Sequence, residues 1–455
     1  MSGMISRLKT ASLGDTLVRR FPPLYSAFRQ QLRTFDDSDI AGRQALQAQL
    51  IQETLAGAAR LRGYAALKGA QLHDYPVLTK ERLRSVPREY MSRSGLLSTA
   101  AATSGSSGVP LSLKRSFSSV VFEQAVLDHV AALAGADFRR DRVAVLRGGA
   151  VKDPSDRDPP YWRPESGGRV LNFSVAHLNA ATAVAFIEAL EAFSPKVMWV
   201  YPSALEMLVA CFERDGRHMQ VPVILSSSEV LSDELRAKAE SLFGACVVDY
   251  YGQAERVSFA YALKAGAYRF LPAYGRVELH AVEGEDKSRF RMIATNLRNR
   301  AQPLIRYDTG DIAIVPGDAS AASLNEVILG CRTFARIEGR ESDYLLAPDG
   351  SRLIGMNHIP RSIDGLLQMQ LRQTEPDRVL VLAVPDGQPS DVLKAAIAAR
   401  MQARLPDTMR IEIRFCDAIE REKSGKMPLV VRAKDIGTSI TDAADAGSLK
   451  FMGVL

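Results

Sequence analysis

The chain lacks clustered cysteines, long apolar runs and dense runs of one charge. Its four cysteines, Cys211, Cys246, Cys331 and Cys416, stand far apart, which excludes a disulfide framework and a zinc site built on paired cysteines. No stretch of about 18 consecutive apolar residues occurs, so no membrane span is expected. The basic beginning of the chain has no continuous apolar core, which argues against a secretory signal. Together these absences predict a cytoplasmic protein with reduced cysteines.

The charge balance is mild for a chain of 455 residues. Against 52 acidic residues stand 58 lysines and arginines, a net charge of +6. Such a balance suits small anionic ligands such as nucleotides, and no nucleic acid partner is expected. Hydrophobic residues make up 46%, enough to bury a core over two to four domains of roughly 150 residues each. No repeat with a period of about 20 to 50 residues is visible, which excludes a solenoid.

Short β-branched runs alternate with helical patterns through the middle of the chain, which predicts an α/β domain. The predicted strands are 142–146, 197–200, 222–225 and 245–249, and the predicted helices include 120–133, one ending near 212, and 232–243. From residue 276 the pattern becomes strand-rich. Strands are predicted there at 276–280, 290–295, 312–315 and 326–329.

A second change of pattern near Gly339 predicts a separate, smaller α+β unit. Its predicted strands are 352–354, 368–372, 378–384 and 409–415, and its predicted helices are 358–367 and 391–404. We therefore expect an N-terminal domain over residues 1–339 and a C-terminal domain over 340–436. Residues 437–455, rich in Ser, Thr, Ala and Gly, are expected to form a loosely held tail.

A loop rich in glycine and hydroxyl groups lies between two strand-like runs. Its backbone N–H groups and hydroxyls can turn toward one anion such as a phosphate. It is not a Walker A loop, because no Lys-Ser/Thr follows its last glycine. Taken alone, the same letters fit a flexible hairpin turn equally well. The residues are Thr103, Ser104, Gly105, Ser106, Ser107 and Gly108.

The second motif, Asp249-Tyr-Tyr-Gly-Gln-Ala-Glu255, directly follows a predicted strand. A glycine turn there can present the Tyr251 ring and the Glu255 carboxylate to one cleft, where they could stack a base and hold a hard cation. In isolation, an ordinary strand-to-loop turn with an exposed acid explains the motif better.

A third motif, Ile305-Arg-Tyr-Asp-Thr-Gly-Asp311, presents Asp311 on a glycine turn beside Arg306. A carboxylate in that position can accept two hydrogen bonds from a ribose diol. By itself, the motif is equally a turn that carries a surface ion pair.

The fourth motif is Arg421-Glu-Lys-Ser-Gly-Lys426, near the C-terminus. A lysine on such a loop can bring a positive charge to a developing negative one. Lysine-rich surface loops are far commoner, so this motif carries weight only in combination with the others.

In order and spacing the four motifs resemble those of the adenylate-forming enzymes, the superfamily of acyl-CoA ligases, peptide-synthetase adenylation domains and luciferases. The resemblance runs from about residue 75 to 432 and includes Gly339-Arg340 as the hinge. The chain is most similar to the phenylacetate–CoA ligase branch and its capsule-biosynthesis relatives, through Pro76-Val-Leu-Thr-Lys80, Tyr201-Pro-Ser-Ala-Leu205 and Ser227-Ser-Glu-Val-Leu-Ser232. The implied fold is α/β: a large N-terminal adenylation domain with packed sheets and a strand-rich subdomain, and a small mobile C-terminal α+β domain.

The resemblance implies that most of these residues bind ATP. They would be Thr103, Ser104, Gly105, Ser106, Ser107 and Gly108 around the β- and γ-phosphates, Ser228 and Glu229 beside the adenine, Tyr251 stacked on it with Gly252 in the following turn, Gln253 at the α-phosphate, and Asp311 at the ribose.

The resemblance also implies three catalytic residues. Lys426 would bridge the substrate carboxylate and the α-phosphate, Glu255 would hold Mg²⁺, and Arg340 would lie near the ribose site. The implied cofactors are ATP and Mg²⁺, with CoA as the acceptor. The implied partners are a small carboxylic acid and CoA or a carrier protein, and a homodimer is left open.

The implied reaction activates a carboxylic acid, aromatic by branch resemblance, as its acyl-adenylate and passes the acyl group to a thiol. Val109 stands where many relatives have a lysine, and Ser342 replaces the usual hinge Asp or Lys. Residues 344–350 replace the glycine-rich stretch that normally follows, which leaves open an amide or ester synthetase with an amine or hydroxyl acceptor. A catalytically silent nucleotide-binding protein is the third alternative, although a binder would not need Lys426.

Two residues in the stretch where that branch builds part of its substrate site stay open. Arg147 is either the partner of a substrate carboxylate or phenolate, or a surface arginine at a strand-end glycine turn. His177 is expected to be a helix-start or core residue rather than a ligand.

Overall fold

The computed structural model describes residues 18–92, 98–102, 111–148, 151–153, 156, 158–179, 181–284, 286–338, 344–348, 352–353, 356, 359–360, 363–421 and 427–433. The chain forms two compact units. Unit 1 comprises Met1–Ser342 and Asp417–Pro428, and unit 2 comprises Asp343–Cys416 and Leu429–Leu455. The 417–428 segment therefore joins unit 1, although it lies in the chain between two parts of unit 2. The predicted boundary after residue 339 and the 437–455 tail lie outside the described residues and stay predictions.

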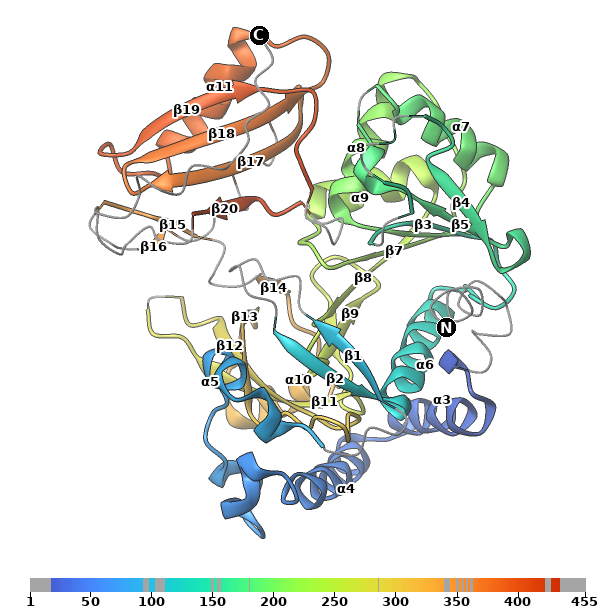
Figure 1. The fold of residues 1–455 in the computed structure, drawn as a ribbon, viewed down its shortest axis with the longest axis vertical. Helices are drawn as coiled ribbons and strands as arrows, with labels where there is room; N and C mark the ends of the chain where they lie inside the picture. The colour runs from blue at the N-terminus through green and yellow to red at the C-terminus, as the bar shows by residue number, and fades with distance from the viewer. Residues whose placement is uncertain are drawn as a thin grey trace. The chain divides into compact units, whose positions relative to one another are not determined.

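The large sheet of unit 1 has eight described strands in the order β10-β9-β8-β7-β6-β3-β5-β4 (Figure 1). Its central strands β5, β3, β6, β7 and β8 are parallel, and antiparallel pairs add β4 at one edge and β9 and β10 at the other. The bounds are β3 (Val143–Leu146), β4 (Trp162–Glu165), β5 (Val170–Phe173), β6 (Val197–Val200), β7 (Val223–Ser227), β8 (Cys246–Gly252), β9 (Phe259–Ala262) and β10 (Tyr268–Phe270).

The order of the parallel strands reverses once. The chain forms β3, continues to β5 on one side, and then crosses to β6, β7 and β8 on the other side. The reversal therefore falls between β3 and β6. In open α/β sheets ligands bind outside the carboxyl ends of the strands at such a point.

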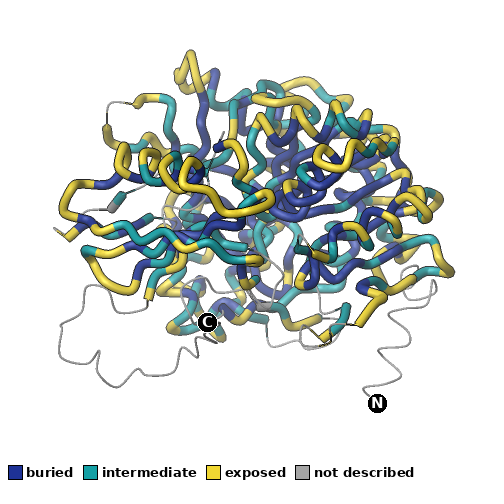
Figure 2. The backbone as a smooth tube through the Cα atoms, turned by 90° about the horizontal axis from the view of Figure 1, so that it is seen from above, coloured by how far each residue is buried: buried dark blue, intermediate teal, exposed yellow. Residues whose placement is uncertain are grey.

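Both faces of this sheet are covered by helices, as its nearly continuous apolar strands require. On one face α6 (Phe117–Leu133), with α3 (Pro22–Asp37) packed beside it, contributes to a core shared with Val143, Val223 and Val248. On the other face lie α7 (Ala183–Phe193), α8 (Pro202–Arg214) and α9 (Asp233–Phe243) (Figure 1). The buried stretches of backbone lie inside these layers and the exposed ones around them (Figure 2).

Local sequence sets the ends of these helices. Pro202 is the first residue of α8, where its missing N–H costs nothing. The Ser232 hydroxyl accepts the Leu235 N–H at 3.1 Å and caps α9, and Gly244 ends that helix with a left-handed φ of 58°. These caps fix where the chain re-enters the sheet as β8.

The second sheet of unit 1 is antiparallel, with four described strands in the order β11-β12-β13-β14, and a β1-β2 pair accompanies it. The predicted strand at 326–329 is wrong: residues up to Ile328 end helix α10, which Ser320 caps by accepting the Ser323 N–H. The bounds are β1 (Ser98–Ala102), β2 (Ser112–Ser116), β11 (Gly275–Ala281), β12 (Arg289–Asn296), β13 (Tyr307–Ile314), β14 (Arg336–Glu338), α4 (Ile40–Ala58), α5 (Lys80–Ser85) and α10 (Ala321–Ile328).

Unit 2 contains a four-stranded sheet in the order β19-β18-β17-β20, with α11 against it. The predicted helix at 358–367 is wrong in its described residues, which form no helix and include the start of β17 at Leu366. The bounds are β15 (Leu345–Leu346), β16 (Arg352–Leu353), β17 (Leu366–Glu375), β18 (Arg378–Pro385), α11 (Asp391–Gln402), β19 (Arg410–Phe415) and β20 (Val430–Arg432). In the described part of the chain, no helix is both long and apolar enough to span a membrane.

Candidate active site

Two tyrosines at the end of β8 project to opposite faces of the strand, as side chains alternate there. Tyr250 packs into the core beneath α6, and Tyr251 packs against the core of the second sheet. The Tyr251 hydroxyl donates to Oδ2 of Asp311 at 2.5 Å and accepts a hydrogen bond from the Gln253 amide. The structure thus brings the second and third sequence motifs together at one point.

An irregularity in β13 positions Asp311. Gly310 adopts a left-handed φ of 73°, and its N–H donates to the Asp308 carboxylate at 3.0 Å. The Asp311 N–H donates to the Thr309 hydroxyl at 3.1 Å, and the pairing with β12 shifts register in this region. Such a bulge re-aims the side chain that follows it, and only glycine adopts this φ without strain. Asp311 is buried, with its carboxylate turned to Tyr251.

Glu255, in the turn after β8, has one satisfied and one unsatisfied oxygen. Its side chain is 3% exposed, and Oε1 accepts the Tyr307 hydroxyl at 3.0 Å. Oε2 is enclosed and has no hydrogen-bond partner among the described residues. A buried carboxylate oxygen left unpaired is costly, and a hard cation would satisfy it. The donor set therefore fits Mg²⁺.

Elsewhere in the described ranges, no three His, Cys, Asp or Glu side chains gather into a metal-binding group. Mg²⁺ in proteins is often held by one or two carboxylates together with substrate phosphates and water. Glu255 alone is thus compatible with a magnesium ion that arrives with a nucleotide.

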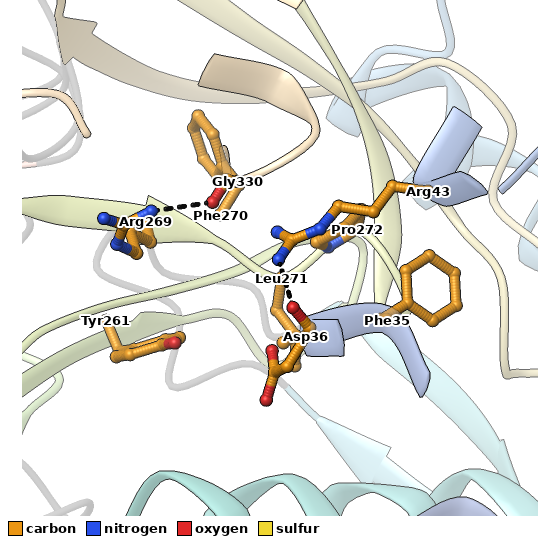
Figure 3. A pocket seen from close by; sticks show the side chains of 9 residues that line it. All are labelled: Phe35, Asp36, Arg43, Tyr261, Arg269, Phe270, Leu271, Pro272 and Gly330. Atoms are coloured by element: carbon orange, nitrogen blue, oxygen red, sulfur yellow. Dashed lines mark hydrogen bonds between the residues drawn. The ribbon is translucent and has the colours of Figure 1, made fainter. Parts of the chain in front are cut away.

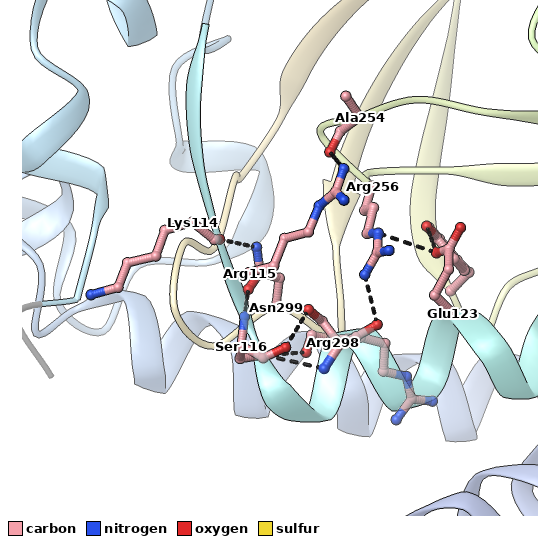
Figure 4. Close-up of polar contacts among 10 residues, drawn as sticks. Lys114, Arg115, Ser116, Glu123, Ala254, Arg256, Arg298 and Asn299 are labelled. Atoms are coloured by element: carbon pink, nitrogen blue, oxygen red, sulfur yellow. Dashed lines mark hydrogen bonds and ion pairs between the residues drawn. The ribbon is translucent and has the colours of Figure 1, made fainter. Parts of the chain in front are cut away.

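Two arginines lie beside Glu255: Arg256 follows it in the chain, and Arg115 contacts Ala254, which precedes it (Figure 4). Arg115, on β2, donates from Nη2 to the Ala254 carbonyl at 2.9 Å, while its buried Nε has no hydrogen-bond partner. Arg256 donates to the Ser119 carbonyl at 2.9 Å and lies 3.4 Å from a Glu123 carboxylate oxygen. Burial, and then the charge of Arg256, lower the pKa of Arg115. Positive charge from β2 and from Arg256 therefore lies beside the Glu255 turn.

Three residues of the site, Arg115, Arg256 and Tyr307, were not predicted from the sequence. Arg256 directly follows Glu255, and Arg115 lies seven residues after Gly108. Their closeness to two predicted motifs was the only indication in the sequence that they belong to the site. The contact of Tyr307 with Glu255 joins residues 52 positions apart. No local sequence pattern predicts a contact between residues so far apart in the chain.

Ser228 and Glu229, which follow β7, make no hydrogen bond to Tyr251, Asp311 or Glu255 among the described contacts. The Ser228 hydroxyl accepts from Nη2 of Arg147 at 3.4 Å. Glu229 accepts the Ser203 N–H on Oε2 at 2.9 Å and the Met427 N–H on Oε1 at 3.0 Å. Both oxygens of Glu229 thus hold backbone groups, and the role of these two residues at an adenine stays a prediction.

His177 is a core residue. Its side chain is 5% exposed and stacks on the Tyr161 ring at 5.2 Å. Its Nδ1 lies 2.8 Å from the Ser174 hydroxyl, and its Nε2 lies 2.9 Å from the Asp156 carbonyl. Both ring nitrogens are engaged, which agrees with the expectation that His177 is no ligand.

A cavity of about 200 Å³ elsewhere in unit 1 contains none of the predicted site residues (Figure 3). Arg43 in its wall donates to the carbonyls of Asp36 and Leu329 at 3.0 and 3.1 Å. Arg269 donates to the carbonyl of Gly330 at 3.0 Å. These cations bridge chain segments, so the cavity is a structural junction rather than the candidate site.

Comparison with known proteins agrees with this geometry. Residues 345–433 match the family model described as the CapK C-terminal domain. A phenylacetate–coenzyme A ligase of Aromatoleum evansii is 24% identical over 213 residues, which cover 44% of this chain and 45% of that ligase. The chain thus matches less than half the length of that curated relative.

Two crystal structures of 2-hydroxyisobutyryl-CoA ligase in the postadenylation state share the fold. They are complexes with R3-HIB-AMP and with 2-HIB-AMP, and both superpose with a TM-score of 0.57 at 15% and 16% identity. Each superposition covers 87% of this chain and 89% of that one. This chain therefore shares the fold of these CoA ligases.

The expected α/β fold with several sheets is confirmed. The described part holds Glu255, Tyr251, Gly252, Gln253, Asp311, Ser228 and Glu229 of the predicted site. The predicted phosphate loop of Thr103, Ser104, Gly105, Ser106, Ser107 and Gly108 lies outside the described residues, as do Arg340 and Lys426. Their roles stay predictions.

Proposed function

We propose that this protein is an AMP-forming carboxylate ligase. A carboxylate oxygen of the acid attacks the α-phosphorus of ATP, the bond to the β-phosphate oxygen breaks, and pyrophosphate leaves. A thiol then attacks the acyl carbon of the adenylate, and AMP departs with the electron pair of the broken C–O bond. The thiol, which loses its proton, is that of CoA or a carrier protein, and the branch resemblance indicates an aromatic acid.

The observation that carries the proposal is the group formed by Glu255, Asp311 and their tyrosines. It joins a buried carboxylate with an unsatisfied oxygen to a second buried carboxylate held by an aromatic hydroxyl. One is suited to a hard cation and the other to a diol. A magnesium nucleotide offers both features in one ligand.

The chain's own residues have distinct tasks in this proposal. Glu255 would hold Mg²⁺, which when bound supplies charge neutralisation between phosphate and carboxylate. Asp311 orients the ribose, and Arg115 and Arg256 stabilise the negatively charged Glu255 turn. We assign Lys426 to the substrate carboxylate and α-phosphate, and residues 103–108 to the β- and γ-phosphates. We also propose that residues 340–436 act as a lid that excludes water from the adenylate.

The test is acid-dependent exchange of labelled pyrophosphate into ATP, run over aryl and short acyl acids without acceptor. Glu255→Gln should lower the exchange about 100-fold, because it weakens the hold on Mg²⁺, and Lys426→Ala at least as much, because it removes a positive charge from the developing transition state. Glu191→Gln is the matched control, since Glu191 pairs with Arg217 at 3.0 Å and contacts no residue of this group. Wild-type exchange that survives both substitutions unchanged would refute the assignment.

The acceptor is tested separately. Addition of CoA should yield a thioester in stoichiometric balance with AMP. If the adenylate forms but only hydroxylamine or another amine consumes it, the second half-reaction is amide rather than thioester formation. ATP binding without exchange for any acid would favour a silent nucleotide-binding protein.

A further inference from the structure

Arg147 stands at the point where the order of the parallel strands reverses. It directly follows β3, and Tyr201 directly follows β6, the strand on the other side of that point. The Arg147 guanidinium lies 4.4 Å from the centre of the Trp199 ring and 5.6 Å from that of Tyr201. Its Nη1 donates to the Tyr250 hydroxyl at 2.5 Å. Residues of β6 and β8 thus surround the guanidinium that follows β3, at the carboxyl edge of the sheet.

This guanidinium carries a charge that no described side chain neutralises. Arg147 is half-buried, yet no carboxylate among the described residues lies within ion-pair distance of it. Its contacts are hydroxyls and aromatic faces, which hold a cation without cancelling its charge. The Arg147 guanidinium donates to the hydroxyls of Tyr250 and Ser228 and also makes a side-chain hydrogen bond with Tyr201, and none of these partners is an anion. An anionic ligand at this position would neutralise the charge of the guanidinium.

Tyr250 adds a second donor to the same place. Its oxygen accepts from Nη1 of Arg147 and from Nε1 of Trp199 at 3.0 Å, which accounts for its acceptor capacity. The phenol proton then remains to be donated, and the described residues offer it no acceptor. A buried hydroxyl proton without an acceptor is costly, so a ligand oxygen is the natural partner.

The residues around Arg147 and the residues proposed to bind the nucleotide lie on different sides of β8. Tyr250 belongs to the first and Tyr251 to the second, and the two side chains enter separate cores. The carboxylate that reacts with ATP belongs beside Tyr251, Gln253 and Glu255 if the proposed function holds. Arg147 is therefore placed for a different part of the substrate.

We propose that Arg147 and Tyr250 bind a second carboxylate of the acid, so that the preferred substrates are dicarboxylic acids. This inference rests on the proposed function and names its substrate class. The planar guanidinium fork matches a carboxylate in two parallel hydrogen bonds, and the rings of Trp199 and Tyr201 hold the fork in place. An acid with a methyl group in that position would leave the arginine charge and the tyrosine proton unpaired.

The experiment compares acids that differ only at the remote end: terephthalate with 4-methylbenzoate, and glutarate with pentanoate. Pyrophosphate exchange should show a higher kcat/KM for the diacid of each pair. Arg147→Met should lower kcat/KM for the diacid about 10- to 100-fold and leave that of the monoacid within about twofold. Arg147→Lys keeps the charge without the fork and should recover only part of the diacid preference.

Arg142→Met is the matched control. Arg142 precedes β3 at its opposite end, is exposed, and has its guanidinium 5.9 Å from the Phe193 ring centre. It should leave both acids of a pair unaffected. An equal loss for both acids in Arg147→Met would overturn the inference, because it would place Arg147 at the reacting group or in the fold. A preference for 4-hydroxybenzoate over terephthalate that vanishes in Arg147→Met would also overturn it, in favour of a phenolate.

Failure of the proposed function gives a different result. In that case no acid supports exchange, and calorimetric binding of terephthalate and 4-methylbenzoate to the full chain decides. Tighter binding of the diacid that is lost in Arg147→Met supports the carboxylate site independently of turnover. Equal binding of the two acids, or binding that Arg147→Met leaves intact, overturns it.

Discussion

The backbone N–H of Met427 donates to Oε1 of Glu229 at 3.0 Å. The other carboxylate oxygen of Glu229 accepts the Ser203 N–H at the start of α8, and Arg421 donates to the Ser203 hydroxyl at 2.8 Å. The 417–428 segment is thus tied at both of its described ends to one corner of unit 1. Met427 directly follows Lys426, so Glu229 controls the chain at the residue next to the predicted catalytic lysine.

Glu229→Ala should release this segment. It removes an acceptor from two backbone N–H groups, each worth roughly 1.5–3 kcal/mol when the acceptor is charged. Because the carboxylate is half-buried, we expect amide exchange in residues 417–428 to accelerate about 30-fold, equivalent to about 2 kcal/mol. Hydrogen exchange measured by mass spectrometry checks this. Glu234→Ala, on the adjacent α9, should leave that exchange unchanged, and equal protection in both variants would contradict the tie.

Tyr307→Phe should weaken magnesium binding without removing a proposed ligand. The hydroxyl holds Oε1 of Glu255 at 3.0 Å, and its loss leaves both carboxylate oxygens without that orientation. We expect the Mg²⁺ concentration for half-maximal pyrophosphate exchange to rise about 10-fold. Unfolding by urea should show a loss of about 1–3 kcal/mol for the unpaired buried group.

Tyr75→Phe is the matched control for that change. Tyr75 is another buried tyrosine in the same core, and its hydroxyl donates to the Leu67 carbonyl at 3.3 Å. It should lower stability while the magnesium titration stays at the wild-type value. If both variants shift the magnesium titration alike, Tyr307 acts through the fold and not through Glu255.

Local sequence patterns predicted the elements whose ends carry their own signals. The strand at 197–200 has the predicted bounds, because an apolar run stops at a Tyr-Pro pair that begins α8. Ser232 and the helix it caps were predicted for a similar reason. The strand predicted at 326–329 is helical because three apolar residues fit either period, and the cap at Ser320 decides.

The candidate site could be predicted only as a set of separate turns. The glycine turns and their acids show in the sequence because backbone geometry demands those residue types. The pairing of Tyr251 with Asp311 arises from the packing of two sheets, and the pairing of Arg147 with Tyr250 from the order of strands within one. Neither hydrogen bond can be predicted from the local sequence around its residues. The sequence therefore left open whether Arg147 lies on the surface or binds the substrate.

Asp249 should make stability depend on pH in the opposite direction from an ordinary surface acid. Burial raises its pKa from 3.8 to about 6, although the Tyr268 hydrogen bond and the Arg236 charge lower it. Between these pH values the folded protein binds the proton that the unfolded chain has lost, so stability falls as pH rises. The loss is about 3 kcal/mol for about two pKa units. Below pH 4 this contribution is fully present.

Asp249→Asn should remove that slope. Urea unfolding at a series of pH values should show the variant gaining on the wild type as pH rises from 4 to 7. Asp318→Asn should instead lose stability relative to the wild type as pH rises, because hydrogen bonds from Ser320 lower the pKa of the exposed Asp318 carboxyl. Parallel pH profiles for wild type and Asp249→Asn would contradict the assignment.

Asp311→Ala should erase the preference for a ribose diol. The carboxylate is buried and oriented by Tyr251, so a nucleotide that lacks a ribose hydroxyl would make one hydrogen bond fewer to it. We expect the wild type to use ATP with a kcat/KM about 10- to 100-fold above that of 3′-deoxyATP, the ratio that a charged hydrogen bond supplies. In Asp311→Ala the two nucleotides should become nearly equal, chiefly through a higher KM for ATP. Asp141→Ala, at an ion pair of 3.2 Å with Lys196 that involves neither β13 nor Tyr251, should lower stability but keep the preference. A preference that persists in Asp311→Ala would place the ribose elsewhere, and the pairing of Tyr251 with Asp311 would then serve only to join the two sheets.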